Sequence, residues 1–271
     1  MKNSLLALSQ AMSSAFVVGP VFGAAIVYSG SGADPASITA VRDSFRVDIG
    51  GGTVAGANGS FGGLRREINW DGVPDTLASP NNLPANFFNA NSPRGVVFST
   101  PGSGFQVSAN AIAPPIEFGN FNATYPAIFQ TFSAQRLFAA VGSNIVDVNF
   151  FIPGTALADS TSAFASIFTD VDLADSTTIE FFSGANSLGL YSAPVANNGL
   201  SFLGVRFNAG ERITRVRITS GNAALGPNDG AGVDVVAMDD FIYAEVAVPE
   251  PSTLLLLAAA LLTFGVTRRR G

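Results

Sequence analysis

The chain is divided into many short apolar segments, and glycine, asparagine, aspartate or proline separates each from the next. In residues 212–219 (RITRVRIT), arginines are interspersed with branched apolar residues. From Arg215 onward the two kinds alternate, so one face of an extended segment is apolar there. Runs of this length with turn residues between them predict β-strands. The predicted strands are residues 64–70, 94–99, 104–109, 136–141, 144–152, 163–172, 177–183, 187–192, 200–207, 212–219 and 234–244.

These strands predict an all-β domain over residues 34–246, an antiparallel β-sandwich that is jelly-roll-like. Two packed sheets need bulky side chains on both inner faces, and the chain has 23 phenylalanines to supply them. The sequence Ser183–Asn186 (SGAN) predicts a tight hairpin turn between two strands.

A short helix is predicted ahead of the strands. Asp34 is placed to cap it, and Pro35 suits the first helical position, where a missing N–H costs nothing. The apolar residues at helical spacing are Ile38, Val41, Phe45 and Ile49. Three glycines, Gly50 to Gly52, end the helix, and the glycine-rich stretch to Gly63 is expected to be a flexible loop.

Composition excludes several kinds of chemistry. The chain has 271 residues, of which 47% are hydrophobic and 13% charged, with no cysteine and no histidine. Disulfides, thiolate or histidine metal sites and a Ser-His-Asp triad are therefore excluded. The formal net charge of −6 argues against a nucleic-acid partner, because phosphates require basic patches.

The N-terminus resembles an export signal. Lys2 provides a small positive region, and Leu5–Val27 is mostly apolar. Small residues follow at Gly23–Ala25, so residues 1–28 are predicted to be a secretory signal peptide that is cleaved somewhere near 23–30. The alternative is an uncleaved N-terminal membrane anchor.

The C-terminus predicts a transmembrane helix of marginal length. Leu254–Val266 is apolar, but a helix of about 13 residues spans ~20 Å and the hydrocarbon core is ~30 Å thick. The three arginines Arg268, Arg269 and Arg270 follow as a membrane stop. By the positive-inside rule they stay in the cytoplasm, and the preceding domain lies outside.

This tail has a specific resemblance. Pro249, Glu250 and Pro251, followed by an apolar run and an arginine cluster, resemble the PEP-CTERM sorting signal of Gram-negative, exopolysaccharide-producing bacteria. The resemblance covers residues 248–271 and implies that a membrane transpeptidase, exosortase, recognises and cuts the tail. It further implies export, a transient hold in the inner membrane, and a final place at the cell surface or in the extracellular matrix, with exopolysaccharide as a candidate partner.

The preceding domain, from about Arg65, resembles a family of secreted bacterial β-sandwich proteins. The matching segments are REINWDGVPD (66–75), NSPRGVVFST (91–100), FTDVD (168–172), LGVRFNAGERITRVRI (203–218) and VAMDDFIY (236–243). The resemblance implies no enzymatic activity, and it implies surface binding or matrix association.

Acidic groups make Ca²⁺ a candidate cofactor. The candidate ligands are Asn69, Asp71 and Asp75, then Asp170 and Asp172 with Asp175 nearby, and Asp239 with Asp240. Two aspartates two positions apart on a strand face the same side, and a calcium ion would relieve their repulsion. The alternative is that these carboxylates are solvated turn residues or helix caps.

The sequence leaves three functions open. The first is a non-enzymatic binding or structural protein of the cell surface or matrix. The second is a calcium-dependent carbohydrate-binding module, with Trp70 as a candidate stacking residue. The third is a polysaccharide-active enzyme that uses a carboxylate pair, with Glu67 and Glu180 as candidates. We predict the first, without catalytic residues.

Overall fold

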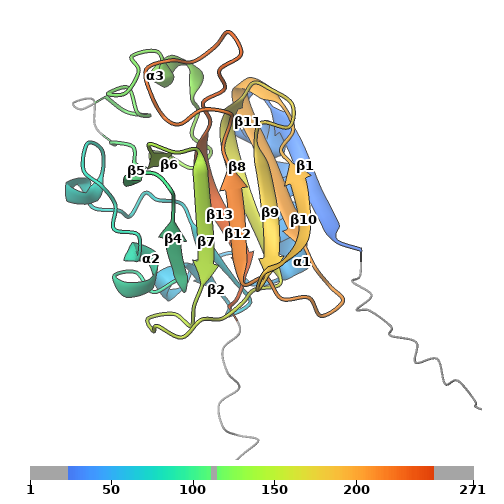
Figure 1. Cartoon of the computed structure of the whole chain (residues 1–271). Coiled ribbons are helices and arrows are strands. Elements are labelled where there is room, and N and C mark those ends of the chain that lie inside the picture. The colour runs from blue at the N-terminus through green and yellow to red at the C-terminus, as the bar shows by residue number, and fades with distance from the viewer. Residues whose placement is uncertain (1–23, 111–114, 247–271) are drawn as a thin grey trace, which may run out of the picture.

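The computed structural model describes residues 24–110 and 115–246, and the chain over these ranges forms two antiparallel β-sheets packed face to face (Figure 1). The all-β prediction is confirmed, and each predicted strand has a counterpart. With eight strands in one sheet and five in the other, the sandwich is larger than an eight-stranded jelly roll.

The eight-stranded sheet runs in the order β1-β11-β8-β13-β3-β2, with β6 paired to β13 and β5 paired to β6. Its strands are β1 (Ile26–Gly32), β2 (Ser60–Phe61), β3 (Arg65–Ile68), β5 (Gly104–Val107), β6 (Phe138–Val141), β8 (Ala163–Val171), β11 (Ala196–Arg206) and β13 (Ala237–Ala244).

The five-stranded sheet runs in the order β10-β9-β12-β7-β4. Its strands are β4 (Val96–Ser99), β7 (Ile145–Phe150), β9 (Thr178–Ser183), β10 (Asn186–Ser192) and β12 (Arg215–Thr219). The hairpin predicted at Ser183–Asn186 joins β9 to β10, and Gly184 there has φ 60°, which a tight turn of this kind requires.

The predicted helix is confirmed as α1 (Pro35–Ile49), which covers the outer face of the eight-stranded sheet. The Asp34 carboxylate accepts the Ser37 N–H at 2.9 Å, and Gly50 with φ 86° ends the helix. Phe45 packs directly over Gly204 of β11, where an added Cβ would lie 2.9 Å from the ring. The remaining helices are short: η1 (Ala57–Gly59), η2 (Asp75–Leu77), α2 (Phe87–Ala90) and α3 (Tyr125–Ile128).

The ordered domain begins earlier than predicted. Strand β1 starts at Ile26 and pairs with β11 along its whole length, although residues up to 28 were predicted as signal peptide and the domain was expected to start at 34. This strand lies at the edge of the sheet and alternates between half-buried and exposed residues, so its apolar pattern is weak.

The glycine-rich stretch after α1 is fastened to the fold, contrary to the flexible loop that was expected. Its strand β2 pairs with β3, and the Arg65 guanidinium donates to the carbonyl oxygens of Gly50 at 2.8 Å and Gly52 at 2.9 Å. A single buried arginine thus holds two carbonyl groups at the start of the stretch in place.

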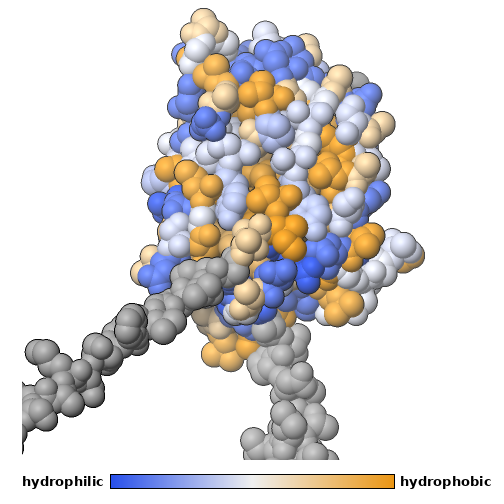
Figure 2. Space-filling model, turned by 90° about the vertical axis from the view of Figure 1, so that its right-hand side faces the viewer, coloured by the Kyte–Doolittle hydropathy of each residue, from blue (hydrophilic) through white to orange (hydrophobic). Residues whose placement is uncertain are grey.

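The main core fills the space between the sheets, and aromatic rings dominate its centre. Trp70 stacks on Phe138 with ring centroids 4.1 Å apart, and Phe241 meets Trp70 edge-on at 5.0 Å. On the face drawn in Figure 2, hydrophobic side chains form small groups separated by polar ones.

Both described ends of the chain lie at one end of the sandwich (Figure 1). Ile26 at the start of β1 pairs with Arg206, and Tyr243 near the end of β13 pairs with Phe164 near the start of β8. The far end of β8 therefore points away from both. Within the described ranges, no helix combines the length and apolarity needed to cross a membrane, and the helix predicted at 254–266 lies outside those ranges.

Candidate functional site

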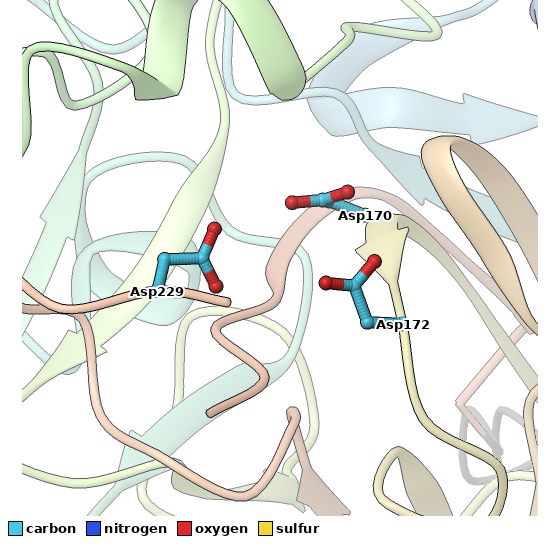
Figure 3. Close-up of side chains that lie close together, drawn as sticks. All are labelled: Asp170, Asp172 and Asp229. Atoms are coloured by element: carbon cyan, nitrogen blue, oxygen red, sulfur yellow. The ribbon is translucent and has the colours of Figure 1, made fainter. Parts of the chain in front are cut away.

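Three aspartates converge at the end of the sandwich farthest from the described termini. Asp170 lies near the end of β8, Asp172 follows the strand, and Asp229 belongs to the loop between β12 and β13. One carboxylate oxygen of each lies within 4.8 Å of those of the other two, and Figure 3 shows the three groups turned toward a common space.

A fourth aspartate organises the turn that carries Asp172. The buried Asp234 carboxylate accepts the N–H groups of Asp172 and Leu173, both at 3.2 Å. Asp170 has φ 65° and accepts the Asn198 N–H at 2.7 Å. The sequence predicted that Asp170 and Asp172 share one face of a regular strand. In the structure they converge because the backbone of Asp170, near the end of β8, has a positive φ.

The cluster lacks a compensating positive charge among the described residues. Burial raises the pKa of Asp170 to about 7, with repulsion from Asp172, Asp229 and Asp234 adding to the effect. The pKa of Asp172 is also raised, first by burial and then by repulsion from Asp234 and Asp229. The Asp172 Oδ1 atom is buried and has no hydrogen-bond partner in the described part of the chain. Carboxylate oxygens are the ligands that Ca²⁺ prefers, so three carboxylates that face a common space suit this ion.

The structure separates the other predicted calcium ligands from this cluster. Asp71 accepts the N–H groups of Gln135 at 2.6 Å and Arg136 at 3.2 Å, and Asp75 forms an ion pair with Arg136. Asn69 donates to Asp71, so the 69–75 turn fixes the 135–136 segment. Asp175 is an exposed turn residue.

Asp239 and Asp240 lie inside the fold, where they hold the 132–133 segment. The Phe132 N–H donates to Asp239 at 2.5 Å, and the Ser133 hydroxyl donates to Asp240 at 2.8 Å. Burial raises the pKa of both carboxyls, that of Asp240 to about 6. Sequence reasoning missed Asp229, because a single aspartate in the glycine-rich segment 226–232 has no periodic neighbours that would single it out.

Two cavities adjoin on one flank of the molecule and share Asn69 and Arg94 in their walls. The first, of about 370 Å³, lies between the 69–74 turn and the α2 region. The second, of about 240 Å³, lies between α1 and β13. Trp70 is 1% exposed and lines the first cavity from within the core, so it is not an open stacking platform for a sugar.

The acids considered for catalysis occupy different places. Glu67 and Asp240 both line the second cavity, whereas Glu180 lies on β9 of the other sheet and accepts the Ser187 hydroxyl at 2.8 Å. Both oxygens of Glu67 are held by arginines, Oε1 by Arg65 at 2.9 Å and Oε2 by Arg46 at 2.5 Å.

Comparison with known proteins identifies the tail. The family model described as the PEP-CTERM protein-sorting motif matches residues 247–270, which include Pro249, Glu250 and Pro251. No curated protein and no solved structure matches the chain, so the likeness of residues 65–246 to secreted β-sandwich proteins remains a prediction. The motif indicates an extracellular protein sorted by an exosortase, and the chain is a PEP-CTERM sorting domain-containing protein.

Proposed function

We propose that the protein is a non-enzymatic binding or structural component of the cell surface or extracellular matrix. In this proposal an export signal carries the chain across the inner membrane of a Gram-negative bacterium, and the C-terminal tail holds it there until exosortase cuts it. The observation that carries the proposal is the sorting motif at residues 247–270, which follows a β-sandwich whose last strand ends at Ala244.

The position of the two ends supports this role. Because the first and last described residues lie at the same end of the sandwich, an anchor at the C-terminus leaves the opposite end turned outward (Figure 1). The acidic cluster of Asp170, Asp172 and Asp229 lies at that outward end. While the chain is anchored, its distal loops therefore meet the environment first.

The experiment concerns the sorting motif. Replacing Pro249, Glu250 and Pro251 with alanines in the full-length chain is expected to leave it unprocessed in the inner membrane. The matched control replaces Ser252 and Thr253, which follow the motif, with alanines and should mature normally. Fractionation and intact mass measure the outcome, and normal maturation of the triple alanine variant would refute the proposal.

A calcium-dependent binding module is the second candidate. It is favoured by the buried Oδ1 atom of Asp172, which lies beside two further carboxylates and has no hydrogen-bond partner among the residues that the structure describes. A bound Ca²⁺ would join β8 to the loop between β12 and β13 and so fix the distal loops. In this second candidate the ordered distal loops would contact a glycan, and the buried Trp70 would not.

A polysaccharide-active enzyme is less well supported. Glu67 and Asp240 line one cavity, and glycosidases need such a pair. However, both Glu67 oxygens already accept hydrogen bonds from arginines, so neither is free to contact a reacting group. We expect no released sugar when the protein is incubated with a polysaccharide panel. Release that disappears in the Asp240→Asn variant would replace our proposal with the enzyme.

A further inference from the structure

Arg94 lines both adjoining cavities and has no acidic partner within residues 24–110 and 115–246. The Arg94 guanidinium donates from Nε to the Glu67 carbonyl oxygen at 3.0 Å and from Nη1 to the Ser92 hydroxyl. It forms no ion pair with any residue in the described ranges, and burial lowers its pKa, with the nearby Arg66 charge acting in the same direction. A partly buried cation is costly unless an anion compensates it.

The second cavity adds further cationic groups. Arg42 and Arg46 lie one helical turn apart on α1, and both line this cavity. Each buries an Nε–H that has no hydrogen-bond partner in the described part of the chain. The Arg42 pKa is lowered by burial and then by repulsion from Arg46. Both arginines already form ion pairs, Arg42 with Asp43 at 2.8 Å and Arg46 with Glu67 at 2.5 Å. An anion in the cavity would therefore act by accepting hydrogen bonds from their Nε–H groups.

The backbone at Gly59 lies directly against the Arg94 guanidinium and leaves room for it in the cavity wall. Gly59 has φ 65°, and a Cβ at this position would lie 2.6 Å from the Arg94 Nε and 2.4 Å from the Glu67 carbonyl oxygen. Only glycine fits here, so the 57–59 turn lies directly against the guanidinium. Phe88 supports the other side, with its ring centroid 5.1 Å from the Arg94 Cζ.

The remaining lining is suited to hydroxyl groups and to apolar ring faces. Asn69 is common to both cavities, and Asn91 and Ser92 border the first. Glu67 and Asp240 provide acceptors in the second, where Phe61 and Phe132 form apolar walls. Cations next to neutral and acidic acceptors match a ligand that has one carboxylate and several hydroxyls.

We propose that Arg94 anchors a binding site for a small hydroxylated carboxylate, of the chemical class of a sugar acid, in the cavities on either side of it. Its guanidinium pairs with the ligand carboxylate, and the amide, hydroxyl and carboxylate groups of the walls bind the hydroxyls. This inference deepens the binding role proposed above. It does not depend on sorting, so its failure would leave the result of the tail experiment unchanged.

The test uses the full-length protein in detergent at pH 7, titrated by calorimetry with glucuronate, glucose or acetate. Glucuronate is expected to bind at least about tenfold more tightly than either glucose or acetate, because only it has both kinds of group. Equal binding of glucose would overturn the anionic anchor, and equal binding of acetate would overturn the hydroxyl contacts. Absence of glucuronate binding would overturn the whole site.

Two arginine variants form a matched pair. Arg212, like Arg94, forms no ion pair in the described ranges, and it donates to the Ser160 hydroxyl and carbonyl oxygens, away from both cavities. Arg94→Gln should weaken glucuronate binding at least about tenfold, and Arg212→Gln should leave it within about twofold. Equal losses in both variants would overturn the proposal.

A third variant tests the same site even if Arg94→Gln does not fold. Asn69 is exposed and common to both cavity walls, and Asn69→Asp keeps its shape while adding a negative charge. We expect this variant to lose glucuronate binding by about tenfold at low salt. It should stay folded, with a somewhat lower melting temperature, because the hydrogen bond that Asn69 donates to Asp71 is lost. If Asn69→Asp keeps its affinity for glucuronate, the ligand carboxylate does not bind in the cavities that Asn69 lines, and the proposal is wrong.

Discussion

The ring of Trp70 lies flat against that of Phe138, with centroids 4.1 Å apart and an angle of 3° between the planes. The Trp70 indole N–H also donates to the Asp239 carbonyl oxygen at 2.7 Å. The chain's single tryptophan therefore joins the 69–75 turn to β6 and β13 in the centre of the core, and it acts as a packing residue.

Replacing Trp70 should show how much this contact stabilises the domain. Trp70→Ala leaves a cavity and an unpaired Asp239 carbonyl, and we expect it to lower the free energy of unfolding by about 3–5 kcal/mol. Trp70→Phe should cost less. Urea denaturation is the measurement, and Leu64→Ala, at a side chain 57% exposed, is the control. A Trp70→Ala loss as small as that of the control would contradict the packing role.

Calcium is predicted to stabilise the protein through the distal cluster. At a Ca²⁺ concentration about 100-fold above the dissociation constant, a native-state ligand adds ~2.7 kcal/mol. Asp229→Asn should abolish this gain, whereas Asp175→Asn, at an exposed aspartate in the neighbouring turn, should keep it. Differential scanning calorimetry with Ca²⁺ or with chelator measures the effect. Identical melting temperatures in both conditions would exclude a calcium site.

The pH dependence of stability follows from the raised pKa values in the calcium-free protein. The pKa of Asp170 is raised to about 7 and that of Asp240 to about 6, in each case mainly by burial. The folded state therefore binds more protons than the unfolded state between about pH 4 and pH 7. Stability that is present at low pH is lost as the pH rises through this window.

The Asp170→Asn variant isolates one part of this effect. An amide stays neutral at every pH, so the variant should be more stable than the wild type at pH 8, with a melting temperature about 2–4 °C higher. At pH 5 the difference should be smaller. Melting curves across this range are the measurement, and a difference that grows toward low pH would contradict the assignment.

The N-terminal boundary makes a further prediction. Ile26, Val27 and Tyr28 pair with Arg206, Val205 and Gly204 in the edge strand, so cleavage after residue 28 would remove these pairs. We expect the mature N-terminus of the exported protein to lie before Ile26. Intact-mass analysis of the exported protein measures it, and a fully stable mature protein that starts at Ser29 would contradict the expectation.

The pattern of neighbouring residues along the chain was sufficient to predict most of the helices and strands. Alternation in the 212–219 segment predicted β12, and Asp34, Pro35 and Gly50 marked the ends of α1, because capping and strand faces depend on neighbours along the chain. Strand β1 escaped prediction because an edge strand is stabilised by its partner β11 and needs little apolar pattern of its own.

The sequence alone determined the sorting motif, because residues 247–270, with Pro249, Glu250 and Pro251, match it as a linear segment whatever the fold. Only the tertiary structure decided which polar residues meet. Asp229 joins Asp170 and Asp172, and Arg94 faces cavities that α1 and the 69–74 turn complete. The physical reason is that these groups come from separate elements, and sheet pairing and core packing bring them together. Charge and burial at such places depend on segments far apart in the chain, which a local pattern does not contain.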